Sequence, residues 1–197
     1  MAILRAVPMP LLPERGSDAA LVAAARLGEG WAAEALFRRH ASVANGLALR
    51  LLGRDSDVDD LVQDSFASAL TKLDRLRDPQ AFEAWLCGIL VRTASKVIRK
   101  RRLLARLGLG RTRLAIDVDA LVAPGAPPDE ALELRRLYAL AQDLPAGIRV
   151  PLLLRRVEGL GLDEISRLTR TSTATVKRRI GEGEERLRAR FLGGRAP

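Results

Sequence analysis

The stretch Phe82–Arg106 constrains this chain more than any other, because it reads FEAWLCGILVRTASKVIRKRRLLAR, without a proline and with a single glycine. Such a stretch can form one long, uninterrupted helix. Within it, mostly apolar side chains recur at steps of three and four residues and would share one helix face: Phe82, Trp85, Leu86, Ile89, Thr93 and Val97. The sequence therefore predicts a long helix that buries this face against a core.

The same helix would carry a second stripe, made only of cations. At about 100° per residue, five basic side chains fall within about a third of the turn with no acid among them: Arg92, Lys96, Arg99, Arg102 and Arg106. A long row of cations on a helix fits a polyanion with regularly spaced charge, and nucleic acid is the natural example. The alternative interpretation is a solvated basic helix end, which the helix dipole favours.

The charge balance of the whole chain agrees with an anionic partner. Its 197 residues carry a net charge of +9, which favours nucleic acid first and an anionic membrane surface second. No apolar run approaches the roughly 18 residues that a membrane span needs. Three prolines break the start of the chain and make it a poor secretion signal, so we expect a loose tail over residues 1–16 and a cytoplasmic protein.

Cysteine and histidine each occur once, at Cys87 and His40. This inventory allows no disulfide within the chain, no Cys/His zinc cluster and no His-based catalytic triad. We expect Cys87 to be a small core residue and His40 to lie on the surface. No cofactor or metal is expected. An enzyme is disfavoured, because we find no phosphate-cradling glycine loop, zinc signature or nucleophile with a histidine partner.

Three further helices are expected before the long one. Ser17 can cap a helix that runs to Leu27, residues 31–52 suit a second helix, and residues 55–73 suit a third whose acids gather in the first turns. Pro79 is well placed as the first residue of the long helix. The expected packing residues of the second helix are Trp31, Ala35, Phe37, Val43, Leu47 and Leu51.

The second half of the chain begins with a change in composition. Residues 108–128 are rich in glycine, proline and short acidic-apolar pieces, which predicts a flexible linker. Residues 129–197 then read as helical, although Pro151 would cost its helix about 3 kcal/mol unless it lies in the first turns. The chain therefore predicts an all-α protein of two small helical domains, over residues 17–107 and 129–197, joined by this linker.

The end of the chain has the pattern of a helix-turn-helix. In GLGLDEISRLTRTSTATVKRRI a short helix would open at Asp163, and Ser172 or Thr173 would cap a second helix after a tight turn. The first turns of such a second helix enter the major groove of DNA. An ordinary helical hairpin with a basic edge is the alternative, but two basic modules on one tether favour DNA binding through effective concentration. The side chains singled out are Thr173, Ala174, Thr175, Lys177, Arg178 and Arg179.

Two blocks of the sequence resemble a known family. VDDLVQDSFASAL, followed by AFEAWLCGIL and a basic run, resembles region two of bacterial sigma factors, and LPAGIRVPLLLRRVEGLGLDEISRLTRTSTATVKRRI resembles their region four. The order of the two blocks is the specific part, and together they cover about residues 17–106 and 129–192. A chain with only these two domains and a linker is similar to the extracytoplasmic-function (ECF) group of the sigma-70 family.

The resemblance implies a dissociable initiation subunit that binds core RNA polymerase, recognises the minus-ten and minus-thirty-five promoter elements and promotes DNA melting. The second domain would also contact the flap of the beta subunit. An anti-sigma factor that sequesters the chain is a family-level expectation. The helix that docks on the clamp coiled coil of the beta-prime subunit would carry Asp60, Leu61, Gln63, Asp64 and Phe66.

The resemblance also implies roles for the basic residues. The minus-ten element would be read and melted by a set that we name the cationic ridge, namely Arg92, Lys96, Arg99, Lys100, Arg102 and Arg106. A loop with Arg75, Arg77, Asp78 and Gln80 would hold a base flipped out of the non-template strand. The helix-turn-helix side chains would read the minus-thirty-five element, and Asp117 and Asp119 of the linker would mimic nucleic-acid charge near the RNA exit path.

The sequence departs from the family pattern in two places. Arg92 and Lys96 replace the short Asn or Asp side chains that relatives often carry, so no minus-ten sequence preference is carried over. The last helix continues with Gly-Glu-Gly-Glu over residues 181–184, where relatives usually have His and Arg. Each glycine weakens a helix by about 1 kcal/mol, and acids repel phosphate, so minus-thirty-five binding is expected to be weaker or shifted to the first helical turn.

The predicted function is thus that of a sigma factor, which binds and does not catalyse. The alternative is a stand-alone helix-turn-helix regulator of transcription, which would bind duplex DNA without polymerase. A further alternative is an interaction protein that occupies polymerase without starting transcription, suggested by the acidic last helix. The acids of residues 57–64 favour the sigma factor, because they have an obvious use only if polymerase is the partner.

Overall fold

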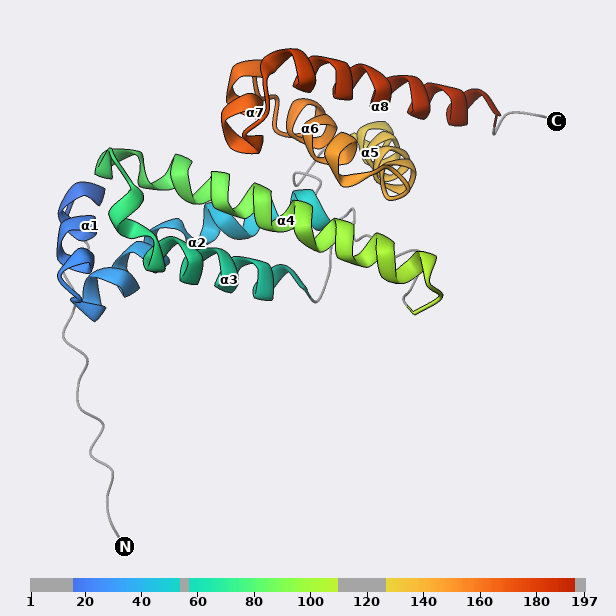
Figure 1. Cartoon of the computed structure of the whole chain (residues 1–197). Coiled ribbons are helices and arrows are strands. Elements are labelled where there is room, and N and C mark those ends of the chain that lie inside the picture. The colour runs from blue at the N-terminus through green and yellow to red at the C-terminus, as the bar shows by residue number, and fades with distance from the viewer. Residues whose placement is uncertain (1–15, 54–56, 110–126, 194–197) are drawn as a thin grey trace, which may run out of the picture.

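The computed structural model describes residues 16–53, 57–109 and 127–193, and within these ranges every regular element is a helix (Figure 1). Helices α1–α4 form an N-terminal unit and α5–α8 a C-terminal unit, as the sequence predicts. The linker acids Asp117 and Asp119 and nearly all of the expected tail lie outside the described residues. The elements are α1 (Asp18–Arg26), α2 (Gly30–Leu52), α3 (Asp57–Thr71), η1 (Leu73–Arg75), η2 (Pro79–Ala81), α4 (Phe82–Arg106), α5 (Pro128–Ala141), α6 (Ala146–Arg156), α7 (Leu162–Thr169) and α8 (Thr173–Gly193).

Local sequence signals explain where the first helices begin and end. The Ser17 hydroxyl accepts a hydrogen bond from the Ala20 N–H (3.3 Å), which makes it the N-cap of α1. Helix α2 ends at Gly53, whose φ of 81° suits glycine. Pro79 opens the short η2 helix, and α4 follows directly. These boundaries agree with the sequence-based expectation to within a few residues.

Helix α4 forms the centre of the molecule. It packs against α2 and α3 on one side and against α6 and α7 on the other. Because neighbours pack on both sides, α4 buries a wider face than the predicted stripe. Three residues of that stripe, Trp85, Thr93 and Val97, are only half-buried. Its buried apolar side chains are Phe82, Leu86, Ile89, Leu90, Val91, Ala94 and Ile98.

In the first part of α2 the core-facing side is rotated by about one residue from the prediction, whereas Leu47 and Leu51 near its end are buried as expected. Ala32, Leu36 and Ala44 are buried. Trp31 and Val43, which the sequence analysis expected to pack, are 37% and 41% exposed. The prediction gave weight to large apolar side chains, whereas the close contact of α2 with α1, α3 and α4 uses small alanines. Phe37, another expected packing residue, is 39% exposed, and Ala35 is partly buried.

His40 is buried, so its predicted place on the surface is wrong. Its side chain is 5% exposed, and its ring centroid lies 5.3 Å from that of Phe82. Its Nε2 lies 3.0 Å from an oxygen of Asp18, and its Nδ1 lies 3.2 Å from an oxygen of Glu83. Both ring nitrogens thus lie close to carboxylates of α1 and α4, with hydrogen-bond geometry at Nδ1 but not at Nε2.

In the C-terminal unit, α6 is covered by α8 and α7. Pro151 lies in the second turn of α6 and is buried; because proline has no N–H, one hydrogen bond of this helix is lost there. Arg170 forms the left-handed turn between α7 and α8, with a φ of 52°. Ser172 caps α8 by accepting a hydrogen bond from the Thr175 N–H (3.3 Å), as predicted.

Gly181 and Gly183 of α8 have different environments. A Cβ added at Gly183 would lie 3.0 Å from Ile148 and 3.2 Å from Leu152, so this glycine permits the close packing of α8 on α6. A Cβ at Gly181 would meet no heavy atom within 4 Å. The sequence analysis expected both glycines only to weaken the helix, but Gly183 has a packing role.

These environments predict opposite results for two alanine substitutions. Gly181→Ala is expected to raise the free energy of unfolding by up to about 1 kcal/mol through helix propensity. Gly183→Ala gains the same propensity but must push back Ile148 and Leu152, so we expect no gain or a loss. Urea denaturation followed by circular dichroism measures both. Equal stabilisation by the two substitutions would contradict the packing role of Gly183.

Candidate nucleic-acid interface

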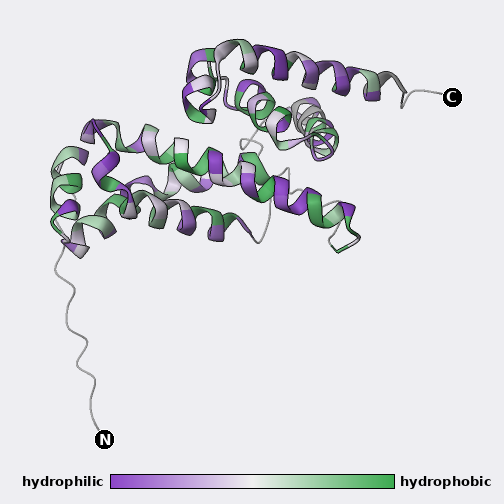
Figure 2. Ribbon diagram, viewed as in Figure 1, coloured by the Kyte–Doolittle hydropathy of each residue, from purple (hydrophilic) through white to green (hydrophobic). Residues whose placement is uncertain are grey.

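The C-terminal half of α4 presents most of the cationic ridge to solvent. Lys96, Arg99, Lys100 and Arg106 are exposed, while Arg102 is half-buried. Burial, together with Arg106 and Arg186, lowers the pKa of Arg102 from its ordinary value. Figure 2 shows hydrophilic positions interspersed with hydrophobic ones along this half of the helix.

Arg101 lies among these cations, but its side chain forms an ion pair within the chain. Its Nε donates to a carboxylate oxygen of Asp57 at 3.1 Å, and a second nitrogen of its guanidinium pairs with the same oxygen. This pair joins the C-terminal part of α4 to the start of α3. Its charge therefore contributes to the fold, and the sequence analysis did not include it in the ridge.

Arg92, at the N-terminal end of the ridge, does not lie on an open surface. Its guanidinium donates a hydrogen bond to the Leu168 carbonyl of α7 (3.2 Å). Burial, and next the charge of Arg170, lower the pKa of Arg92 from its ordinary value. In this structure the ridge is thus accessible from Lys96 onward, and its first residue lies under the C-terminal unit.

The expected base-holding loop lies between η1 and α4. Arg75, Arg77, Asp78 and Gln80 are all exposed. Asp78 also has a structural role, because its carboxylate accepts the Gln80 N–H (3.0 Å) and so caps η2. A residue that the sequence analysis missed, Arg26 at the end of α1, donates to the carbonyls of Leu73 (3.0 Å) and Leu76 (2.5 Å) and fixes the start of the loop.

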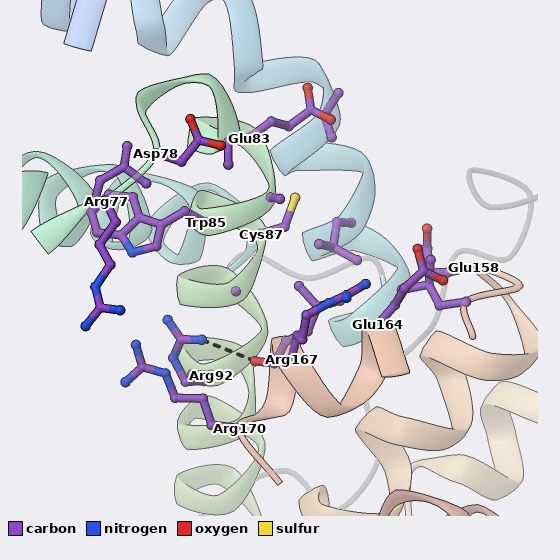
Figure 3. Close-up of a pocket in the computed structure, with 18 of the residues that line it drawn as sticks. Arg77, Asp78, Glu83, Trp85, Cys87, Arg92, Glu158, Glu164, Arg167 and Arg170 are labelled. Carbon is purple, nitrogen blue, oxygen red and sulfur yellow. Dashed lines mark hydrogen bonds between the residues drawn. The ribbon is translucent and has the colours of Figure 1, made fainter. Parts of the chain in front are cut away.

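A cavity of about 720 Å³ lies where this loop, α2, α4 and the C-terminal unit meet. Trp85 and Cys87 line it from α4, and aliphatic side chains of both units line it as well. Figure 3 shows Arg77, Arg92 and Arg170 near one end of the cavity and Glu158 and Glu164 near the other. The cavity therefore combines an indole ring with several guanidinium groups, which suits a nucleobase and its phosphate.

The helix-turn-helix that the sequence predicts is present as α7 and α8. Three of the six singled-out residues are exposed on the first turns of α8, namely Ala174, Lys177 and Arg178. Thr173 instead donates to a carboxylate oxygen of Asp163 (3.1 Å), and the Thr175 hydroxyl lies 2.9 Å from that of Ser172.

Arg179, the last of the six, is only half-buried. Its guanidinium carbon would lie 3.7 Å from a Cβ built at Gly147 of α6. Thr173, Thr175 and Arg179 therefore also take part in contacts within the chain. Ala174, Lys177 and Arg178 remain the side chains best placed to meet DNA.

Two acids of α8 are paired within the chain. Glu184 accepts from Arg156 of α6 at 2.6 Å, and Glu182 accepts from Arg186 one turn further along at 2.7 Å. Pairing reduces the repulsion of phosphate that the isolated sequence predicts. Both acids follow the first turns of α8, so they lie away from its N-terminal end.

Helix α3 presents an acidic face. Asp60, Gln63 and Asp64 are exposed, whereas Leu61 and Phe66 are 2% and 3% exposed and belong to the core. The Phe66 ring packs on that of Phe37, with centroids 4.7 Å apart. Of the five residues expected to bind polymerase, three are accessible and two hold the helix in place.

Two kinds of feature, a metal-binding cluster and a membrane-spanning helix, are absent from the part of the chain that the structure describes. Among residues 16–53, 57–109 and 127–193, no group of three or more His, Cys, Asp and Glu side chains is arranged to hold a metal ion. In the same residues, no helix is both long and apolar enough to span a bilayer. The described surface features are therefore a basic helix, a helix-turn-helix and an acidic helix.

Comparison with protein families matches both halves of the chain. The Sigma-70 region 2 model matches residues 36–103, and the Sigma-70, region 4 model matches residues 134–187. The first span covers most of α2 and extends almost to the end of α4. The second includes the whole of α6 and α7 and the basic first turns of α8.

Individual relatives are similar over most of the chain. The ECF RNA polymerase sigma-E factor of Salmonella typhimurium is 30% identical over 190 residues, which cover 89% of this chain and 95% of the relative. The protein of the same name from Escherichia coli has the same identity and coverage. The ECF RNA polymerase sigma factor SigE of Mycolicibacterium smegmatis is 31% identical, over 78% of this chain and 59% of that protein.

Two solved structures are similar in fold. The structure of CnrH in complex with the cytosolic domain of CnrY has a TM-score of 0.57 and 27% identity, and the match covers 92% of this chain and all of that one. The sigma factor RpoE in complex with the anti-sigma factor NepR from Bartonella quintana also has a TM-score of 0.57. Its identity is 22%, over 79% of this chain and 94% of that one, and it supports the fold alone.

The two family models thus match the two helical units in order along the chain, and the relatives are similar over most of its length. The chain belongs to the extracytoplasmic-function group of the sigma-70 family and is an RNA polymerase sigma factor that acts in transcription initiation.

Proposed function

We propose that the cationic ridge contacts the minus-ten element and that the start of α8 contacts the minus-thirty-five element. The observation that carries this proposal is the exposure of Lys96, Arg99, Lys100 and Arg106 along a single helix, in a chain that also contains a helix-turn-helix. Cations in a row bind successive phosphates without reading sequence. Ridge binding would thus position the factor on DNA and hold the opened strand.

The loop of Arg75, Arg77, Asp78 and Gln80 is proposed to receive a flipped-out base. Its cavity offers the Trp85 ring for stacking and arginines for the adjoining phosphates. Unstacking a base costs a few kcal/mol, which contacts to the opened strand offset. The factor would therefore melt DNA by binding free energy and not by catalysis.

For the minus-thirty-five element, we propose that Lys177 and Arg178 make the main contacts and that Ala174 lies against base edges. Arginine can bind guanine through two hydrogen bonds, while lysine reaches a base or a phosphate. Thr173, Thr175 and Arg179 would support the helix-turn-helix and contribute less to binding.

The acidic face of α3 is proposed to bind the clamp coiled coil of the polymerase beta-prime subunit, with the C-terminal unit on the beta flap. We also propose an anti-sigma protein as a further partner, because the 27% identical CnrH was solved in complex with another protein, the cytosolic domain of CnrY. These partners would place the protein's action in the cytoplasm. The match of both family models does not favour a stand-alone regulator.

Charge reversal on α3 tests the polymerase contact. Asp64→Lys is expected to weaken binding to core polymerase about tenfold, because it puts a like charge against a basic partner. Asp59→Lys is the matched control, since Asp59 is also exposed on α3 but points about 100° away from Asp60. Competition with a fluorescently labelled wild-type factor measures both affinities. Equal losses in the two variants would contradict a specific role for the Asp60–Asp64 face.

The whole proposal is tested by transcription in vitro. Core polymerase with the purified factor should start RNA synthesis at a discrete set of genomic sites, and sequencing the transcripts gives those sites. Core polymerase alone is the control. A stand-alone regulator would instead bind duplex DNA without polymerase and give no new start sites, and that outcome would overturn the proposal.

A further inference from the structure

The two helical units are joined by a specific contact at the C-terminal end of α2. Carbonyls in the last turn of a helix have no N–H partner within that helix. Here three successive carbonyls, those of Arg50, Leu51 and Leu52, all accept hydrogen bonds from side chains of the C-terminal unit. One unit therefore completes a helix end of the other (Figure 1).

Arg149 of α6 supplies two of these hydrogen bonds. Its guanidinium nitrogen lies 3.0 Å from the Leu51 carbonyl oxygen and 3.4 Å from that of Leu52. The residue is 6% exposed, so its charge is removed from water where the negative end of the α2 dipole can stabilise it. Burying the charge of an arginine costs free energy unless a partner compensates it. Here the partner is the end of α2, so the burial of Arg149 is favourable only while the two units are in contact.

Tyr138 of α5 supplies the third. It is fully buried, and its hydroxyl donates to the Arg50 carbonyl at 2.6 Å. Burial raises the pKa of this phenol well above its ordinary value, so it remains a donor. The Arg50 side chain also pairs with Glu158, which follows α6. Tyr138, Arg149 and Glu158 thus all converge on one turn of α2.

The contact between the C-terminal unit and the end of α2 also determines which parts of the N-terminal unit are covered. With the C-terminal unit held on α2, Arg92 donates to the Leu168 carbonyl, and Glu164, Arg167 and Arg170 enclose the cavity beside the base-holding loop (Figure 3). The C-terminal unit therefore covers Arg92, the first residue of the cationic ridge. It also lines part of the cavity proposed for the base.

We propose that Tyr138 and Arg149 form a latch on the end of α2 that keeps the free factor closed and its base-holding cavity covered. Opening the latch exposes the cavity and Arg92 and lets the two units separate to reach two promoter elements. The effect on DNA binding rests on the proposed function, whereas the closed state itself does not. Nucleic acid and polymerase would bind the open state and draw the chain into it.

The chain contains its own reporter of opening. Cys87, its only cysteine, lines the cavity, and burial followed by Glu83 and Glu158 raises the pKa of its thiol to about 11. Opening moves Glu158 away from Cys87 and exposes the cavity to solvent. Both changes increase the reactivity of the thiol. A maleimide that carries a polymer chain is too large for the cavity and reacts only with molecules that have opened. Its rate therefore follows the open population.

The experiment compares Tyr138→Phe, Arg149→Gln and the double variant with the wild type, without polymerase. Removing one neutral hydrogen bond should raise the reaction rate of Cys87 about fivefold, and removing the charged donor should raise it about tenfold or more. Small-angle scattering should show a larger radius of gyration in the same order. Arg156→Gln is the control, because Arg156 lies on the same helix but pairs with Glu184 inside the C-terminal unit.

A folded double variant that retains the wild-type rate and radius would overturn the latch. If the double variant loses its helical circular dichroism, Tyr138→Phe decides, because it removes a single oxygen atom. A random-sequence single-stranded oligodeoxynucleotide should bind the latch variants more tightly than the wild type. Faster labelling without tighter binding would overturn the covering role. Failure of the wild type to initiate with polymerase would instead count against the proposed function and leave the labelling result valid.

Discussion

Replacing Arg99, Lys100 and Arg102 together by glutamine is expected to reduce initiation at the factor's promoters about 100-fold at moderate salt, because three phosphate contacts are lost at once. Arg99 and Lys100 are exposed on α4, and Arg102 is half-buried beside them. The slope of log affinity against log salt concentration should also become shallower by about 2.7 for the promoter complex. Glutamine preserves the length and helix propensity of these side chains, so the fold should be unchanged.

The measurement is run-off transcription with core polymerase over a range of salt concentrations. Arg101→Gln is the matched control, because Arg101 lies between the replaced residues but pairs with Asp57. That control should lower the stability of the α3–α4 contact and keep most of the initiation activity. Initiation unaffected by the triple replacement, or lost equally in the control, would rule out the assigned role of the ridge.

Truncation of Phe82 to alanine is expected to lower the free energy of unfolding by about 3–5 kcal/mol, the largest loss that we expect from a single substitution in this chain. Phe82 is fully buried at the start of α4. Its ring contacts His40 and Trp85, with centroid separations of 5.3 and 6.3 Å. The cavity left behind would also loosen the site where His40 lies between Asp18 and Glu83.

Urea denaturation followed by circular dichroism measures this loss. Leu103→Ala is the matched control, because Leu103 lies on the same helix and is 58% exposed, so its truncation should cost less than about 0.5 kcal/mol. A Phe82→Ala variant as stable as the Leu103→Ala variant would show that the start of α4 is not part of the core.

Helix boundaries could be predicted because local chemistry determines them. Ser17, Gly53 and Ser172 each act within one turn of the helix end that they define. The phase of a helix depends instead on its neighbours in space. Small alanines such as Ala32 and Ala44 are buried in α2 because other helices approach closely there, and no residue near them in the sequence indicates this.

The candidate site was predicted in part for the same reason. Spacing alone was sufficient to place Lys96, Arg99 and Arg106 on an accessible part of α4. It could not reveal that Arg92 lies under α7, because the covering residue, Leu168, is 76 positions further along the chain. Nor could it assign Arg26 to the loop, because the carbonyls that Arg26 meets are 47 and 50 positions further along the chain. The Asp78 cap of η2 is local, by contrast, and a cap signal before Pro79 could have found it.

Arg170 illustrates a trade between turn geometry and charge. A non-glycine residue in the left-handed region at φ 52° costs about 1 kcal/mol, and glycine would relieve that cost. Glycine, however, has no guanidinium to place beside Arg92 at the mouth of the cavity. The turn between α7 and α8 thus places a cation over the cavity while the two units are closed, and the chain tolerates a strained backbone there.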